Sequence, residues 1–242
     1  MKQILLITDG CSNMGLSPIT AASFAQEAGI TVNVAGVIDY GTIGELGSVE
    51  IANIAAAGGG ISRIVGTRQL SQTIQMMTRK TVVQTIQQAV NRELKQILGH
   101  ASLEEIPPHQ RSQVVEVVDE LTETTALDIA LMIDASASMK PKLGAVEEAI
   151  RDLMLNLQAR EGSSRLAVFH FPGSHSGEEV VLDIDWTKDS GCLKSIFHRL
   201  PMRGATPTGP AMMKVIDFFH YGTLVEQSNY EEKDGMPGDR VV

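Results

Sequence analysis

Residues 1–10, MKQILLITDG, contain the strand from which the fold can be worked out. The apolar run at residues 4–7 is unbroken, which is typical of a strand buried on both faces in a parallel sheet. Asp9 follows this run at once, at the carboxyl end of the strand, where open α/β sheets bind their ligands. We therefore expect a central strand, and part of a functional site, at the start of the sequence.

Strand and helix patterns alternate along both halves of the chain. This alternation favours βαβ units around a parallel sheet with helices on both faces. One connection, the turn at residues 173–177, is so short that the strands it joins must be antiparallel. The expected fold class is α/β, a doubly wound Rossmann-like sheet of six strands with one antiparallel edge strand. The expected strands are 4–7, 30–38, 61–65, 126–133, 166–171 and 180–184, and the expected helices are 18–28, 46–57, 68–98, 109–121, 146–160, 192–200 and 210–220.

A helical segment at residues 80–125 separates the two halves. Apolar residues from Val83 to Ile97 recur every three or four positions on a Gln-rich helix, and Pro107-Pro108 marks the start of another helix. This pattern has two interpretations. The segment is either a helical hairpin that packs on the body, or a helix that binds a partner or a second copy of the chain.

Composition excludes several classes of protein. The chain has 242 residues and a net charge of −9, and only 4% of its residues are aromatic, so binding to nucleic acid is not expected. No stretch approaches the roughly 20 apolar residues that a membrane helix needs. Two cysteines and no secretory signal indicate a soluble, cytoplasmic protein. Residues 223–242 are polar and acidic, and we expect them to form a disordered tail.

Oxygen-bearing side chains gather where three expected strands end or helices begin. Asp9 follows the first strand, Asp134, Ser136 and Ser138 follow the strand at 126–133, and Thr206 precedes the last helix. Carboxylates and hydroxyls are hard ligands that suit Mg²⁺, Mn²⁺ or Ca²⁺ better than zinc. Taken singly, the aspartates and Ser136 also fit helix N-caps. All of them together predict a cation site at one edge of the sheet.

Three motifs resemble those of a known family. Residues 134–138 read D-A-S-A-S, residues 206–209 read T-P-T-G, and residues 8–10 read T-D-G. Each resembles one part of the metal-ion-dependent adhesion site of von Willebrand factor A domains, which include integrin I domains. The resemblance implies that Mg²⁺ (or Mn²⁺) binds Ser136 and Ser138 directly. It also implies that Asp134, Thr206 and Asp9 complete the site, directly or through water, and that Thr208 caps the helix that follows.

The order of the motifs departs from the family, in which the D-x-S-x-S strand comes first and the T-D-G strand fourth. The chain therefore resembles a circularly permuted member. The family sheet order, 3-2-1-4-5-6, would place the first strand here beside the strand at 126–133. We expect one domain at 1–222, with the family's C-terminal half at 1–79, the helical segment at 80–125 and the N-terminal half at 126–222.

The resemblance implies a metal-dependent protein-binding module, an intracellular scaffold or regulatory partner whose cation bridges to an Asp or Glu of another protein. We do not expect an enzyme. The main alternative is a metal-assisted phosphoryl transferase or hydrolase using the same acidic crevice. However, the sequence has no G-x-S-x-G elbow and no P-loop lysine. A structural scaffold with an idle metal site is the third hypothesis, and a homodimer through the helical segment is left open.

Overall fold

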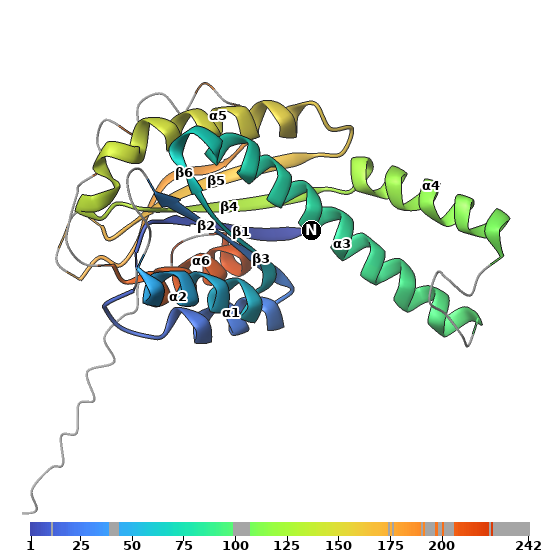
Figure 1. Cartoon of the computed structure of the whole chain (residues 1–242), viewed down its shortest axis with the longest axis horizontal. Helices are drawn as coiled ribbons and strands as arrows, with labels where there is room; N and C mark the ends of the chain where they lie inside the picture. Colours follow the sequence, from blue (N-terminus) through green and yellow to red (C-terminus); the bar gives the residue numbers. More distant parts are fainter. Residues whose placement is uncertain are drawn as a thin grey trace, which may run out of the picture.

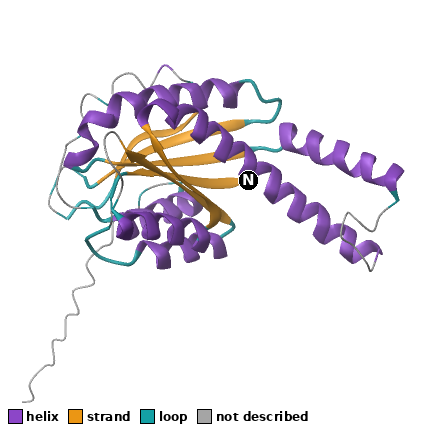
Figure 2. Ribbon diagram, viewed as in Figure 1, coloured by secondary structure: helices purple, strands orange, loops and turns teal. Residues whose placement is uncertain are grey.

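The structure, a computed structural model, describes residues 1–10, 12–38, 44–98, 107–173, 175, 177–189, 191, 197, 200, 206–222 and 224. It contains one sheet with helices packed on both faces (Figure 2). The strands are β1 (Lys2–Thr8), β2 (Ile30–Ile38), β3 (Gly59–Gly66), β4 (Leu127–Asp134), β5 (Ser164–Phe171) and β6 (Val181–Thr187).

The sheet has six strands in the order β3-β2-β1-β4-β5-β6. Neighbouring strands are parallel except β5 and β6, which pair antiparallel at one edge. The α/β fold class and the antiparallel edge are therefore confirmed, although the edge strand runs to Thr187 rather than to residue 184. The order is also the one that the permutation predicted, with the first strand of the chain beside β4.

Helices cover both faces of the sheet, as a doubly wound fold requires. Figure 1 shows α3 and α5 over one face and α1, α2 and α6 over the other. Their bounds are α1 (Pro18–Glu27), α2 (Glu45–Ala57), α3 (Leu70–Leu98), α4 (Pro108–Thr124), α5 (Leu143–Gln158) and α6 (Thr208–Tyr221), with short 3-10 helices η1 (Thr67–Gln69) and η2 (Ala137–Lys142).

Strand β1 lies in the middle of the sheet and contributes to both hydrophobic cores. Leu5 and Ile7 pack in the core beneath α3 and α5, while Ile4 and Leu6 pack in the core beneath α1, α2 and α6. All four side chains are at most 1% exposed. Because successive side chains of a strand point to opposite faces, a strand covered on both faces needs an unbroken apolar run.

The helical segment packs on the body at one end, and its first helix, α3, closely matches the expected helix at 68–98. Helix α3 follows β3 directly through η1, and its Ile74, Val82 and Ile86 are buried in the core shared with α5. Val118 of α4 joins the same core. Figure 1 shows the far half of α3 and α4 extending beyond the sheet. The near end thus packs as a hairpin on the body, and a partner-binding role for the far end stays a prediction.

Some predictions fall on residues that the structure does not describe. Most of the expected helix at 192–200 and nearly all of the acidic tail at 223–242 lie outside the described residues. Within the described residues, none of the helices is both long enough and apolar enough to span a membrane. The division of the chain into one permuted domain and a tail stays a prediction.

Candidate metal centre

The pairing of β1 with β4 brings together two segments that lie far apart in the sequence. The strands are parallel, and Ile7 pairs with Ile133 in their register. Both strands therefore end at the same edge of the sheet, with Asp134 as the last residue of β4 and Asp9 just after β1. This is the edge at which open α/β sheets bind ligands.

Asp134 is completely buried and is held by two hydrogen bonds. The Thr8 hydroxyl donates to Oδ2 at 2.6 Å, and the backbone N–H of Ser136 donates to Oδ1 at 2.8 Å. Burial raises the pKa of Asp134 above its ordinary value. Hydrogen bonding from Thr8 and from the backbone and side chain of Ser136 opposes that shift, and the nearby charge of Asp9 adds to it. The hydrogen bonds thus hold the carboxylate in one position. Burying its charge costs free energy, which a bound cation would offset.

The two serines connect the two aspartates. Ser136 Oγ and Ser138 Oγ lie 3.1 Å apart, and the Ser138 hydroxyl donates to Asp9 Oδ1 at 2.9 Å. Ser136 stands at the N-cap position of η2, but its side chain makes no capping hydrogen bond. Its hydroxyl is directed to Ser138 instead, so helix capping does not account for its position.

The spacing of these oxygens fits a small divalent cation. Neighbouring ligands of an octahedral Mg²⁺, at about 2.1 Å from the ion, lie roughly 3.0 Å apart. The separations of 3.1 Å between the serine oxygens and 2.9 Å between Ser138 Oγ and Asp9 Oδ1 match this value. Ordinary hydrogen bonds have the same lengths, so these two separations are compatible with a shared cation and do not by themselves distinguish one.

Thr206 lies at the same edge and is held there through its backbone. Its carbonyl accepts hydrogen bonds from the Ser12 hydroxyl and the Asn13 N–H, both at 3.2 Å, and its N–H donates to Asn13 Oδ1 at 2.8 Å. The Thr206 residue is 5% exposed. The loop after β1 thus positions both Asp9 and Thr206.

The predicted capping role of Thr208 is wrong. Helix α6 begins at Thr208 itself, and its N-cap residue is Pro207, which makes no side-chain capping bond.

The neighbouring Gly209 allows two segments to approach each other closely. A Cβ at this position would lie 1.9 Å from the Leu16 carbonyl oxygen, so the start of α6 approaches the loop after β1 closely. Only glycine allows this approach.

Two residues of the site were not found from the sequence. Thr8 supports Asp134, and the Lys142 ammonium donates to Asp9 Oδ2. Lys142 is the last residue of the 3-10 helix η2, and no spacing or motif in the sequence indicated its contact with Asp9. Among the described residues, no three His, Cys, Asp or Glu side chains cluster as metal ligands. The candidate site therefore offers a cation two carboxylates, and its other side-chain ligands would be hydroxyls.

The fold and the site define an open α/β protein with a candidate cation site at the carboxyl ends of its two central strands. No family model matches the chain. It is 48% identical over 213 residues to the uncharacterized protein YabS of Bacillus subtilis (strain 168), covering 88% of this chain and 86% of YabS. The chain belongs to the family of YabS.

A solved structure at high similarity agrees on the fold. A crystal structure of an uncharacterized protein from Alicyclobacillus acidocaldarius is 42% identical, with a TM-score of 0.84 over 92% of this chain and 94% of that chain. A structure of proximal thread matrix protein 1 from the mussel byssus, with a zinc-occupied MIDAS motif, is 18% identical and covers 85% of this chain and 43% of that chain. Its TM-score is 0.27, and this likeness carries no argument.

Proposed function

We propose that the protein is a metal-dependent protein-binding module, in which a divalent cation binds a carboxylate of a partner protein. The observation that supports this best is the chain of oxygens from Ser136 through Ser138 to Asp9, with spacings close to an octahedral edge. The cation is Mg²⁺ or Mn²⁺. Its ligands are Asp9, Asp134, Ser136, Ser138 and Thr206, some of them acting through water.

The chemistry of the ligand set leaves room for a partner. A bound dication supplies a Lewis acid that holds a further oxygen ligand, and two protein carboxylates with neutral hydroxyls do not saturate it. An Asp or Glu of another protein is a suitable ligand for a remaining position. The role of Asp134 is to fix the loop that carries Ser136.

The order of the strands supports a relation to von Willebrand factor A domains. In the permuted arrangement, Asp9 and Asp134 come from neighbouring strands of one sheet, as the T-D-G and D-x-S-x-S motifs do in that family. We propose that the chain is a permuted domain of this kind, which acts as an intracellular scaffold or regulatory partner and not as an enzyme. The two carboxylates of the site are assigned to the cation, and its other side chains are hydroxyls, which are weak general bases.

Calorimetric titration of Mg²⁺ and Mn²⁺ into metal-free protein tests the proposal. We expect one dication per chain for the unaltered protein. Asp9→Ala and Asp134→Ala should each lose it, although these residues come from opposite parts of the sequence. Asp128→Ala is a matched control, because Asp128 lies at the start of β4, away from the site edge, and pairs with Arg165. Absence of binding to the unaltered protein, or binding that survives Asp9→Ala, would contradict the proposal.

The partner carboxylate is tested with a small probe. In the presence of Mg²⁺, acetate or a short Asp-containing peptide should shift the NMR signals of the loops at Asp9 and Ser136, and the same peptide with Asn should not. Removal of the metal with EDTA should abolish the shifts. Equal shifts with and without metal would mean that the carboxylate does not bind the cation.

A further inference from the structure

Lys142 is a buried cation in contact with the candidate metal ligands. Its ammonium donates to Asp9 Oδ2, and the side chains of Lys142 and Asp9 are only 11% and 4% exposed. A lysine is rarely buried unless it is paired, because removing an ammonium from water is costly. The pair is therefore a structural feature of the site and not a surface contact.

Asp9 is shared between the serine loop and this lysine. Its Oδ1 accepts a hydrogen bond from Ser138 at 2.9 Å, and its Oδ2 accepts from Lys142. Lys142 closes η2 and stands immediately before α5, whereas Ser138 lies near the beginning of η2. The same short segment thus provides both a candidate metal ligand and a positive charge that neutralises another ligand.

A dication and an ammonium on one carboxylate repel each other. Because the side chains of Lys142 and Asp9 are mostly buried, this repulsion at a few ångströms is stronger than between exposed charges. A cation that binds Asp9 and Ser138 therefore meets a competitor in Lys142. The lysine stem is flexible and carries a strongly hydrated head group, so it can move into solvent when its partner is taken.

We propose that Lys142 is a built-in counter-cation of the metal site, which holds Asp9 in place until a divalent cation displaces the ammonium from it. This inference rests on the proposed metal-binding function and adds a residue that sets the affinity of the site. Metal binding then releases a positive charge to the surface beside the cation, where an acidic partner binds. The unaltered protein binds metal less tightly than its oxygen ligands alone would allow.

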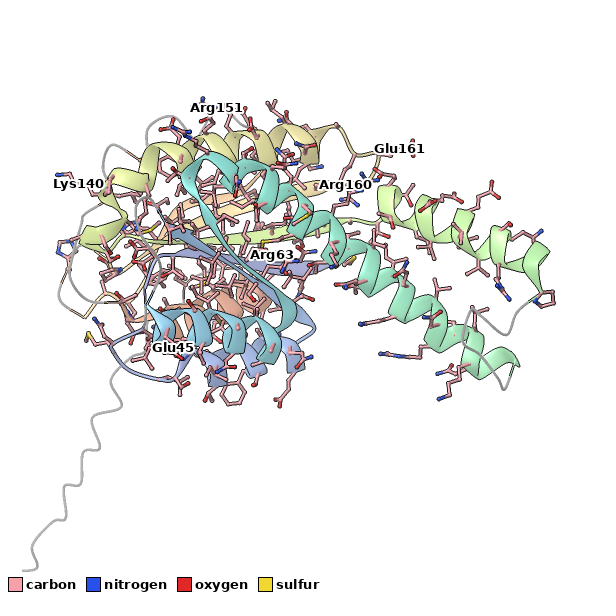
Figure 3. The ribbon with its side chains drawn as sticks, viewed as in Figure 1. Glu45, Arg63, Lys140, Arg151, Arg160 and Glu161 are labelled. Carbon is pink, nitrogen blue, oxygen red and sulfur yellow. The ribbon has the colours of Figure 1, made fainter. Side chains whose placement is uncertain are left out.

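Titration of Mn²⁺ into Lys142→Met and Lys140→Met tests the effect on affinity. Lys140 is an exposed lysine of the same 3-10 helix, and Figure 3 shows it at the outer surface, so its removal makes the same change in net charge without touching Asp9. We expect Lys142→Met to lower the dissociation constant at least tenfold. Lys140→Met should change it less than twofold.

Amine labelling of the unaltered protein tests the displacement directly, and it does not depend on the folding of a variant. A lysine-reactive reagent and peptide mass spectrometry should show Lys142 protected in EDTA and labelled several-fold faster in saturating Mn²⁺, while Lys140 is labelled equally in both. Asp9→Asn should raise the labelling of Lys142 without metal.

The outcomes separate the two proposals. If the unaltered protein binds Mn²⁺ but Lys142 stays protected, or Lys142→Met binds no more tightly than Lys140→Met, the counter-cation role is wrong and metal binding stands. If only Lys142→Met binds Mn²⁺, the cation does not displace the ammonium in the unaltered protein, and both the proposed function and the counter-cation role fail. If no variant binds a cation, the proposed function and the counter-cation role both fail.

Discussion

Asp134 offers the sharpest test of the site, because two substitutions at this position should differ in their effect on folding and have the same effect on metal binding. Its carboxylate accepts hydrogen bonds from the Thr8 hydroxyl and the Ser136 N–H inside a site from which water is excluded. Asp134→Ala removes both acceptors. Asp134→Asn removes the charge but keeps an oxygen for the Ser136 N–H. Its amide NH2 faces Thr8, whose hydroxyl can accept from it and donate to the Gly10 carbonyl instead.

The free energy of unfolding follows from these two hydrogen bonds. A buried donor without an acceptor costs about 1–3 kcal/mol, so Asp134→Ala should lose about 2–6 kcal/mol. The Thr8 hydroxyl has the Gly10 carbonyl 3.4 Å away as a second acceptor, which favours the lower half of this range. In EDTA, Asp134→Asn should fall within about 1 kcal/mol of the unaltered protein, or exceed it.

The pH dependence has a definite sign. Burial raises the pKa of Asp134 in the folded state, so the folded state holds its proton more tightly than the unfolded state does. The resulting stability is present below the ordinary carboxyl pKa and is lost as pH rises through the raised pKa. Across that window, metal-free unaltered protein should lose stability relative to Asp134→Asn, in which this residue has no proton to lose.

Urea denaturation in EDTA and in saturating Mg²⁺ measures all of these effects. At a Mg²⁺ concentration 100 times the dissociation constant, the unaltered protein should gain about 2.7 kcal/mol, and neither variant should gain. The reasoning is refuted if Asp134→Asn is as unstable as Asp134→Ala in EDTA, since the hydrogen bonds would then not explain the loss. It is also refuted if Asp134→Asn gains as much from Mg²⁺ as the unaltered protein.

Three further predictions concern the supports of the site and the fold. Gly209→Ala should destabilise the protein by about 1–3 kcal/mol and weaken Mg²⁺ binding, because the added Cβ would clash with the Leu16 carbonyl oxygen. Chemical denaturation measures the first effect and calorimetry the second. Gly144→Ala is the control, because no atom lies near the Cβ at that position. Asn33→Leu should cost about 2–5 kcal/mol by chemical denaturation, since the fully buried Asn33 Oδ1 accepts from both the Ile61 N–H and the Thr81 hydroxyl at 2.9 Å; a cost below 1 kcal/mol would mean that these donors find other acceptors. Arg151→Ala should change stability by less than about 1 kcal/mol, because its pair with Glu147 is partly exposed; a larger loss would show that the pair does more than a surface ion pair does.

The architecture could be predicted from the sequence because its signals are local and repeated. The run at residues 4–7 requires cover on both faces, and the short turn after Phe171 requires an antiparallel edge strand. Element ends were less certain. The strand at 181–187 extends past the predicted end at residue 184. Asp185 disfavours a strand at that point, whereas Trp186 and Thr187 favour one. The short 3-10 turn before α3 also carries no distinct sequence signal.

The candidate ligands could be predicted, because they belong to short motifs that follow strands or precede a helix. The residues that contact these ligands, Thr8 and Lys142, could not. Lys142 lies in a stretch, MKPKL, where nothing in the sequence distinguishes it from the exposed Lys140. What separates the two lysines is the turn of η2, which directs one ammonium to Asp9 and the other to solvent. Because Asp9 reaches that position only through the pairing of β1 with β4, the Lys142 contact follows from strand order. Any substitution that weakens this pairing should therefore release Lys142 and remove the metal ligand at the same time.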